Sequence, residues 1–267
     1  MVHVALTIAG SDSSGGAGIQ ADLKTFAAFG VYGASVVTAL TAQNTGGVHA
    51  IAAVEASFVA AQIDAVLDDL DVGTAKTGML LSAAVIDAVA DRLATRPLPH
   101  LVVDPVLVAT TGEALLEPAG IARLRERLVP LATLLTPNLR EAEALTGRPV
   151  ANPADMRAAA RALLDLGARA VLVKGGHLQG EALDLLDDGR NVRELSAPRI
   201  ATRDTHGTGC MLSAAIAAGL ARGLDLTAAV VAAKRYVTRA IESAPRIGRG
   251  GRGLHHLSQG DPLRPTS

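Results

Sequence analysis

The 267-residue chain has few of the residues that mark specialised protein classes: one cysteine, no tryptophan, two tyrosines and three phenylalanines. A single cysteine excludes an intrachain disulfide and any cysteine-rich zinc or iron–sulfur site. The shortage of aromatic side chains excludes aromatic cages and base-stacking surfaces. Alanine, leucine and valine must therefore fill the core.

An excess of charge of one sign is also missing. The 25 lysines and arginines balance 26 acidic residues, so the net charge is −1. This balance gives no electrostatic basis for binding nucleic acid or an anionic membrane surface. Polar and glycine residues interrupt the longest uncharged stretch, 29–54, which makes it a poor membrane span. With no basic segment after Met1, we expect no signal peptide and a cytoplasmic protein.

Short apolar runs alternate with segments of helical period along most of the chain. The runs are rich in valine, leucine and threonine and are apolar on both faces, as a sheet covered on both sides requires. The expected strands are Val2–Gly10, Ser35–Gln43, Ala75–Leu80, Leu101–Val106, Leu134–Asn138 and Ala170–Gly175. This alternation predicts an α/β fold with a mainly parallel central sheet and helices on both faces.

Several helix ends and one hairpin have clear local signals. We expect N-caps at Ser57, Ser82 and Asn152, and a helix stop at Gly167. The sequence Asp-Asp-Gly-Arg at 187–190 predicts a hairpin and an antiparallel sheet edge.

Two long helices, 207–222 and 227–243, are expected near the end of the chain. No linker or repeat divides the chain, so we predict one domain over residues 1–250. Residues 251–267 are predicted to form an irregular tail.

Polar or glycine residues follow all six expected strands. In an open parallel sheet, ligands bind beyond the carboxyl ends of the strands, so these residues predict one functional rim. They are Gly10–Asp12, Gln43–Thr45, Gly78–Met79, Asp104–Pro105, Pro137–Asn138 and Lys174–Gly176.

The strongest local signal is the segment 204–210, which leads directly into an alanine-rich helix. Gly207 and Gly209 flank Thr208, and Cys210 follows. Glycines allow a tight turn that presents backbone N–H groups, and a helix N-terminus adds partial positive charge. This pattern predicts an anion hole for a phosphate or a phosphoryl group in transfer; a plain glycine-rich helix start is the alternative.

A second glycine-rich loop, 13–18, precedes the first helix. It matches the dinucleotide fingerprint only in a permissive form, and no acid occurs between Asp22 and Glu55 to bind a ribose. Close approach to a substrate explains this loop better than NAD does. A Walker A sequence is absent, so any ATP must be bound without a P-loop.

Asn138 stands at an expected strand end, and Glu141 lies in the first turn of the next helix. These two oxygen-bearing side chains suit a hydrated Mg²⁺ near phosphates. The alternative is that the helix dipole alone favours an acid at this position.

Together the motifs resemble the hydroxymethylpyrimidine/phosphomethylpyrimidine kinases, which belong to the ribokinase-like superfamily and act in thiamine biosynthesis. The resemblance runs in order over residues 3–250. The matching segments are Ile8–Lys24, Thr38–Thr45, Lys76–Leu80, Asp104–Val106, Thr136–Glu143, Val173–His177 and His206–Cys210.

The resemblance implies a three-layer, ribokinase-like α/β sandwich that uses ATP and Mg²⁺. It implies phosphorylation of 4-amino-5-hydroxymethyl-2-methylpyrimidine and then of its monophosphate, and it suggests a homodimer. Gln43 and Met79 would contact the pyrimidine, with Gly10 and Val106 lining the site. The amine of Lys174 would face the transferring phosphates, and the segment 207–210 would form the anion hole.

Five further candidates carry more general expectations. Asp22 is expected to brace the substrate loop, or to be a solvated helical acid; Asp104 and Thr208 are assigned to the nucleotide side with Asn138. His177 and His206 are expected to tie loops by hydrogen bonds.

The chemistry of Gln43 supports the pyrimidine independently. A 4-aminopyrimidine presents an amino donor beside a ring-nitrogen acceptor, and a side-chain amide offers the complementary pair. A loop hydrogen bond is the alternative role for Gln43.

Cys210 stands where sugar kinases of the superfamily carry an aspartate base. A thiol at a helix N-terminus should have a lowered pKa and could accept a proton. The alternative is a small packing residue.

Two other functions remain open at this stage. A pyridoxal or pyridoxine kinase of the same superfamily would also phosphorylate a hydroxymethyl group on a six-membered aza-ring. A non-catalytic pyrimidine sensor would use the same pocket, but it would have no need of Lys174, Asn138, Glu141 and the anion hole.

Overall fold

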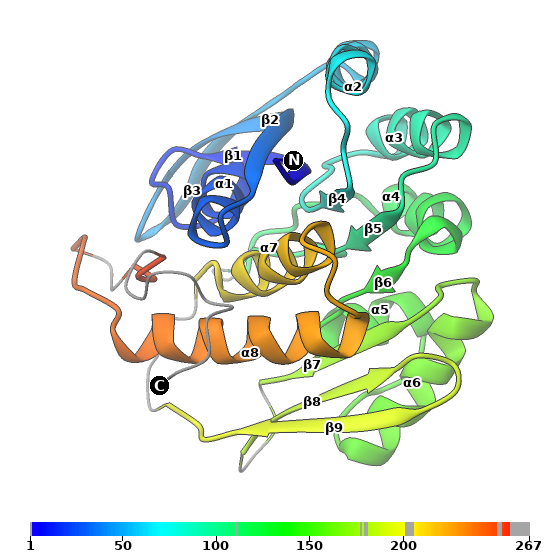
Figure 1. Ribbon diagram of the computed structural model, residues 1–267, viewed down its shortest axis with the longest axis vertical. Coiled ribbons are helices and arrows are strands. Elements are labelled where there is room, and N and C mark those ends of the chain that lie inside the picture. Colours follow the sequence, from blue (N-terminus) through cyan, green and yellow to red (C-terminus); the bar gives the residue numbers. More distant parts are fainter. Residues whose placement is uncertain are drawn as a thin grey trace.

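The structure is a computed structural model that describes residues 2–109, 112–176, 178, 181–200, 206–249 and 253–256. Its strands are β1 (Val4–Asp12), β2 (Tyr32–Asn44), β3 (Gly47–Ala53), β4 (Thr74–Thr77), β5 (His100–Val103), β6 (Leu134–Leu135), β7 (Val171–Gly175), β8 (Ala182–Asp187) and β9 (Val192–Ala197). They form one sheet in the order β3-β2-β1-β4-β5-β6-β7-β8-β9 (Figure 1). The six neighbouring strands β2, β1, β4, β5, β6 and β7 run parallel. At the two edges, β3 pairs antiparallel with β2, and β8 and β9 continue the sheet antiparallel from β7.

The helices are α1 (Gly18–Ala28), α2 (Ala56–Asp69), α3 (Ala83–Thr95), α4 (Pro118–Arg123), α5 (Leu139–Thr146), α6 (Pro153–Asp165), α7 (Thr208–Ala221) and α8 (Leu226–Glu242). Helix α4 continues through a π turn (Leu124–Leu128) and a 3₁₀ turn (Val129–Leu131). Among the described residues, no helix combines the length and the apolar character needed to cross a membrane.

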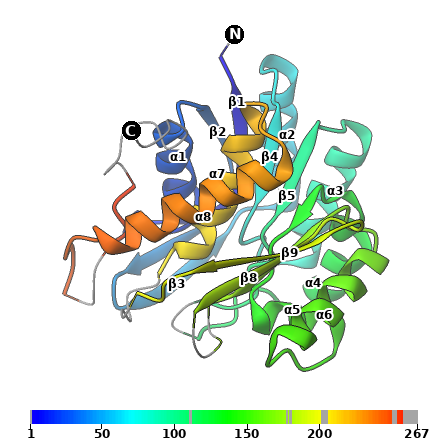
Figure 2. The ribbon, with the colours of Figure 1, turned by 60° about the horizontal axis from the view of Figure 1, so that its bottom comes forward.

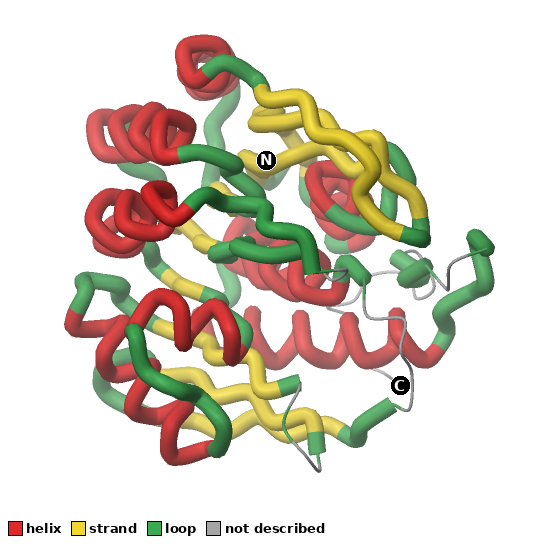
Figure 3. The backbone as a smooth tube through the Cα atoms, turned by 180° about the vertical axis from the view of Figure 1, so that it is seen from behind, coloured by secondary structure: helices red, strands yellow, loops and turns green. Residues whose placement is uncertain are grey.

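Helices cover both faces of the sheet, as the α/β pattern predicts. One face carries α1, α7 and α8, and the other carries α2 to α6 (Figures 1 and 3). The residues of α7 from Met211 to Leu220 are all buried, because α7 lies between the sheet and α8 (Figure 2). Phe29 and Tyr236 meet edge to face on this side, at 5.1 Å between ring centroids. The predicted three-layer architecture is confirmed.

Most predicted local signals are confirmed. The side chains of Ser82 and Asn152 accept hydrogen bonds from the N–H groups of Val85 and Asp155, as N-caps do. The predicted hairpin is β8–β9, and the two late helices are α7 and α8. The N-cap at Ser57 is wrong, because α2 starts at Ala56 after Glu55.

The β2–β3 region differs from the prediction. Strand β2 is 13 residues long and extends past the rest of the sheet, where β3 pairs with it. The expectation that this strand is apolar and buried on both faces is wrong for its second half, where Leu40, Ala42 and Asn44 are exposed.

The predicted tail is only partly described. Residues 253–256 have no regular secondary structure, but they are packed rather than frayed. Leu254 joins the core around α7 and α8, and the hydroxyl of Tyr236 donates to the carbonyl oxygen of His256 at 2.6 Å. All the strands of the described residues belong to one sheet, and the single domain over residues 1–250 stays a prediction.

Candidate active site

The carboxyl ends of the parallel strands and the first turn of α7 meet at one edge of the sheet. Most of the predicted site residues lie there, in two groups. A charged group surrounds Lys174 at the end of β7, and a mixed polar and apolar group lies beyond β1, β2 and β4.

Lys174 forms the centre of the charged group. Its Nζ donates to Oδ1 of Asp104 at 2.8 Å and lies 3.8 Å from Oε2 of Glu141. A Cβ atom added at Gly209 would lie 3.3 Å from the same Nζ. The amine is therefore held against the first turn of α7, where helix N–H groups have no intrahelical acceptor.

Asp104 is almost fully buried and holds this amine in place. Its carboxylate also accepts hydrogen bonds from the hydroxyls of Thr136 at 3.2 Å and Ser213 at 3.1 Å. Burial opposes ionisation, but the charges of Lys174 and Lys76 hold the pKa of Asp104 below its usual value. Asp104 therefore positions Lys174 as an ionised partner.

Asn138 and Glu141 form a capping box at the start of α5. Oδ1 of Asn138 accepts from the N–H of Glu141, and Oε2 of Glu141 accepts from the N–H of Asn138. Burial raises the pKa of Glu141 to about 7, against the opposing charge of Lys174. Glu141 therefore caps the start of α5, as the helix-dipole alternative allows. Its buried carboxyl group also lies beside the amine of Lys174.

The two glycine-rich loops touch each other directly. Gly207 has a φ of 82°, and a Cβ there would lie 1.9 Å from the carbonyl oxygen of Gly16. Only glycine tolerates both the left-handed conformation and this close approach. The loop before α1 and the loop before α7 are thereby fixed to one another.

Cys210 lies in the first turn of α7, but its thiol is not activated. Burial raises the pKa of the thiol to about 11; Lys76 opposes the shift, while Asp22 and Asp104 add to it. The expectation of a lowered thiol pKa is therefore wrong, because burial and two carboxylates outweigh the helix N-terminus.

Gly10, Met79 and Val106 come together in a small apolar cluster at the rim. Met79 forms a cluster with Ala39 and Leu115, and the partly buried Val106 packs against this cluster. A Cβ at Gly10 would lie 2.9 Å from Cε of Met79. The register of β1 with β2 shifts between Ala9 and Ser11, so two residues of β2 lie opposite Gly10.

Gln43 lies at the end of β2, where its backbone and side chain are both held. Its N–H donates to Oγ of Ser13, and its Oε1 lies 3.1 Å from Oγ1 of Thr41. Its Nε2 lies 3.2 Å from Nε2 of His206, which in turn lies 3.2 Å from Oδ2 of Asp12. The expected loop-tying role of His206 is thus seen in its contacts.

Asp22 is fully buried, so the alternative of a solvated helical acid is wrong. Its carboxylate is 2.8 Å from Nζ of Lys76 and accepts a hydrogen bond from the hydroxyl of Thr7 at 2.6 Å. Although burial opposes it, Asp22 holds the pKa of Lys76 above its usual value. Any effect of Asp22 on a substrate must act through α1 and β4, which this pair joins.

Sequence reasoning missed Lys76, Ser213 and Thr136 as parts of the site. A lysine inside the apolar run Ala75–Leu80 was the available signal for Lys76, because a buried lysine needs a buried acid. The candidate His177 and the residues 204–205 of the anion-hole segment lie outside the described residues.

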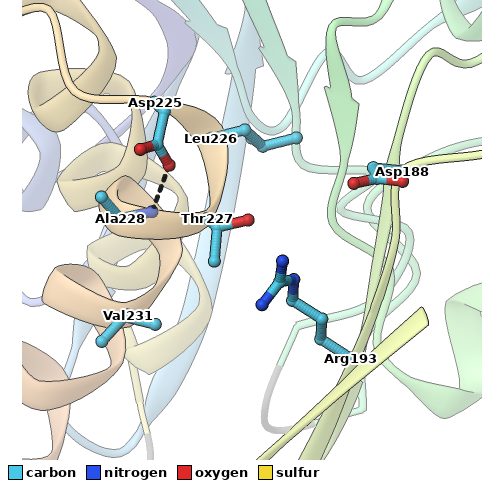
Figure 4. A pocket seen from close by; sticks show the side chains of 7 residues that line it. All are labelled: Asp188, Arg193, Asp225, Leu226, Thr227, Ala228 and Val231. Atoms are coloured by element: carbon cyan, nitrogen blue, oxygen red, sulfur yellow. Dashed lines mark hydrogen bonds between the residues drawn. The ribbon is translucent and has the colours of Figure 1, made fainter. Parts of the chain in front are cut away.

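A second hollow lies far from this rim. It is formed by the β8–β9 turn and the start of α8. Asp225 caps α8 by accepting a hydrogen bond from the N–H of Ala228, and Arg193 points towards Thr227 (Figure 4). None of the predicted site residues lines it.

Comparisons with known proteins agree with the motifs. The sequence profile of the phosphomethylpyrimidine kinase family matches residues 12–255. A hydroxymethylpyrimidine/phosphomethylpyrimidine kinase of Rhizobium meliloti is 58% identical over 96% of this chain and 98% of its own length.

Solved structures give the same result. A phosphomethylpyrimidine kinase of Clostridium difficile is 44% identical with a TM-score of 0.81, covering 90% of this chain and 100% of its own. An ADP complex of Bacillus subtilis pyridoxal kinase is 39% identical with a TM-score of 0.90, covering 96% and 98%. The chain therefore belongs to the phosphomethylpyrimidine kinase family, as its motifs predict.

Proposed function

We propose that this chain transfers the γ-phosphoryl group of ATP to the hydroxymethyl oxygen of 4-amino-5-hydroxymethyl-2-methylpyrimidine, and then phosphorylates the monophosphate to the diphosphate. One observation carries the proposal beyond family membership: Asp104 holds the amine of Lys174 against the first turn of α7. An ammonium group beside the N–H groups of a helix's first turn, which have no acceptor within the helix, is suited to a phosphate in transfer.

In the proposed reaction, the hydroxymethyl oxygen forms a bond to the γ-phosphorus as the bond to the bridging oxygen breaks. Lys174 and the N–H groups of Gly209 and Cys210 neutralise the charge on the moving group. ADP leaves, and the hydroxyl proton passes to an oxygen of the transferred phosphoryl group and from there to solvent. Because the pKa of Cys210 is raised to about 11, its thiol is protonated at neutral pH and does not serve as a base in the free enzyme. Transfer of this kind depends mainly on positioning and electrostatic stabilisation.

The pyrimidine would lie against the apolar cluster of Gly10, Met79 and Val106, with the amide of Gln43 at its amino edge. A buried amide left unpaired makes such a site reject rings without that edge. The buried Asp22–Lys76 pair would keep the loop before α1 in place beneath the substrate.

The nucleotide would lie on the side of Asn138, Asp104 and Thr208. Bound Mg²⁺ would neutralise phosphate charge there. Within the described residues, no group of three or more potential ligand side chains is arranged to hold a metal alone. A hydrated Mg²⁺ carried by the nucleotide phosphates needs only one nearby carboxylate, and Glu141 fits this role through a water molecule.

The decisive experiment is mass spectrometry of the products formed from the aminopyrimidine alcohol, ATP and Mg²⁺. We expect first one and then two added phosphoryl groups. Recovery of the unmodified alcohol would contradict the kinase activity and favour a sensor. A mono- but not a diphosphate product would contradict the second step alone.

The similarity to the Bacillus subtilis pyridoxal kinase supports a second activity, phosphorylation of pyridoxal. Release of ADP with pyridoxal in place of the pyrimidine tests it.

We also propose the homodimer that the resemblance suggests. The cytoplasmic location stays a prediction.

A further inference from the structure

His206 connects the loop before α7 to the pyrimidine side of the site. Its Nε2 lies 3.2 Å from both Oδ2 of Asp12 and Nε2 of Gln43. The ring lies beside Gly16, where an added Cβ would be only 3.0 Å from its Cδ2. Gly207, the next residue, is fixed against the carbonyl oxygen of Gly16. The imidazole of His206 therefore faces the side chain that is proposed to recognise the substrate.

The surroundings of Asp12 determine where the proton on His206 lies. The carboxylate of Asp12 accepts hydrogen bonds from the N–H groups of Ser14, Gly16 and Ala17. Burial opposes ionisation, but hydrogen bonds from His206 and Ser14 lower the pKa of Asp12 to about 2. An ionised oxygen at 3.2 Å requires a donor on His206, so Nε2 carries a hydrogen.

Because Nε2 of His206 lies 3.2 Å from both partners, its one hydrogen can be shared between Oδ2 of Asp12 and an acceptor on the amide of Gln43, but it cannot be paired with a second donor. The amide can turn over and exchange Oε1 with Nε2 at no change of shape. Nε2 of Gln43 is the amide atom 3.2 Å from Nε2 of His206, so in this orientation two donors face each other. At the other end, Thr41 donates its one hydroxyl hydrogen to the carbonyl oxygen of Ser11 at 2.9 Å. Its oxygen is then an acceptor for the amide atom at 3.1 Å. Both neighbours select the orientation with Oε1 towards His206 and Nε2 towards Thr41.

We propose that His206 is a positioning residue that sets ring specificity, by fixing which way the amide of Gln43 faces the substrate. This inference rests on the proposed role of Gln43. A fixed amide keeps one oxygen lone pair and one N–H for the ring, in an order that suits an amino group beside a ring-nitrogen acceptor. The 4-oxo analogue presents the reverse order, a carbonyl beside an N–H, and would be matched only by the turned amide.

The test is the ratio of kcat/KM for the 4-amino alcohol to kcat/KM for its 4-oxo analogue. For His206→Leu, which removes the donor, we expect this ratio to fall by about tenfold or more, the effect of one mismatched hydrogen bond. His206→Gln, whose amide N–H can take the place of the ring N–H, is expected to stay within about threefold of the unmodified ratio. Where the 4-oxo compound is not turned over, its inhibition constant replaces kcat/KM.

A second variant guards against loss of folding at position 206. Thr41→Val removes the acceptor at the other end of the amide and is expected to lower the same ratio. The KM for ATP should not change in any of these variants.

A merely structural role for His206 would lower kcat for both compounds equally and leave the ratio unchanged, which would overturn the inference. The Gln43→Leu variant separates this failure from that of the proposed function. If Gln43→Leu lowers the ratio and His206→Leu does not, only the inference is wrong. If Gln43→Leu changes neither the ratio nor the KM for the pyrimidine, the proposed role of Gln43 is wrong as well.

Discussion

At the residue scale, Cys210 shows why position in a helix does not determine the chemistry of a side chain. The first turn of a helix lowers the pKa of a thiol. Burial has the larger effect here, and the carboxylates of Asp22 and Asp104 offset the charge of Lys76. The sequence contains the helix start but not the three-dimensional neighbours, so the direction of the pKa shift could not be predicted.

The protonation state of Cys210 can be measured directly, because this is the only cysteine in the chain. With a pKa raised to about 11, the thiol should react slowly with iodoacetamide at pH 7, and the rate should rise steeply above pH 9. A small-molecule thiol in the same buffer is the control and should reach its plateau earlier. A rate that is already maximal at pH 7 would contradict a raised pKa and a neutral thiol.

Glu141 gives a second prediction at this scale. Its pKa is about 7 in the folded chain, against an ordinary value of 4.5. Between these values the unfolded chain loses the proton and the folded chain keeps it, so stability falls as pH rises through this window. Glu141→Gln removes this penalty and still accepts the hydrogen bond from the N–H of Asn138. We therefore expect the variant to be more stable than the unmodified protein at pH 8.

The expected gain at pH 8 is on the order of 2 kcal/mol, or a few degrees in Tm. At pH 4 both side chains are neutral, and the gain should vanish. Thermal unfolding at the two pH values measures it. Glu143→Gln, on the exposed side of the same helix, is the matched control and should change Tm at neither pH. An equal gain at both pH values would show that the charge of Glu141 is not the cause.

At the element scale, local sequence signals predicted the helix ends and the turn that are fixed by a residue's own side chain or backbone. Ser82 and Asn152 cap their helices through their own oxygens, and Asp188-Gly189 turns the chain between β8 and β9. The start of α2 has no side-chain cap at all, which is why Ser57 was an unreliable signal. Strand β3 was missed because most of its residues are exposed and it lacks the pattern of a buried core strand; its pairing with β2 makes it a strand.

The same limit applies to the site. The glycine turn, Lys174 and the apolar residues Gly10 and Met79 follow from strand ends and loop motifs. The pairing of Lys76 with Asp22 does not, because the two residues are 54 positions apart and meet only when α1 packs on the sheet beside β4. Contacts between elements depend on packing, which no local pattern encodes.

This buried ion pair predicts a large loss of stability in single variants. Lys76→Met leaves the carboxylate of Asp22 buried without its partner, which should cost about 3–5 kcal/mol of unfolding free energy. In the double variant Lys76→Met/Asp22→Asn neither buried charge of this pair remains, and more than half of the loss should be recovered. Urea unfolding measures both.

Lys24→Met is the control for this pair. Lys24 lies on the exposed side of α1, so its replacement should change the unfolding free energy by no more than about 0.5 kcal/mol. If Lys76→Met is as mild as Lys24→Met, or if the double variant is less stable than Lys76→Met alone, the pair does not carry the charge balance described here.

At the scale of the whole molecule, the end of the sheet at β3 bears on the proposed homodimer. Leu40 and Ala42 of β2 lie opposite Ala52 and Ala50 of β3, and all four side chains are exposed on one face. Leu40 alone is 53% exposed. An apolar face at an edge strand is the kind of surface that folded proteins cover, and two copies related by a twofold axis can cover it with the same patch.

We therefore predict that Leu40→Asp converts a dimer into a monomer, because it would bring two like charges together in an apolar contact. Sedimentation velocity at micromolar concentration measures the molecular mass. Val231→Asp is the matched control: this valine is 38% exposed on α8, at the hollow far from β3, and its replacement should leave the dimer intact. A monomeric unmodified protein would contradict the homodimer, and a dimer that persists in Leu40→Asp would show that the contact lies on another face.

Since Gln43 is three residues further along β2, a dimer built here would also stiffen the strand that presents it. The KM for the pyrimidine should then rise in Leu40→Asp while the KM for ATP stays constant.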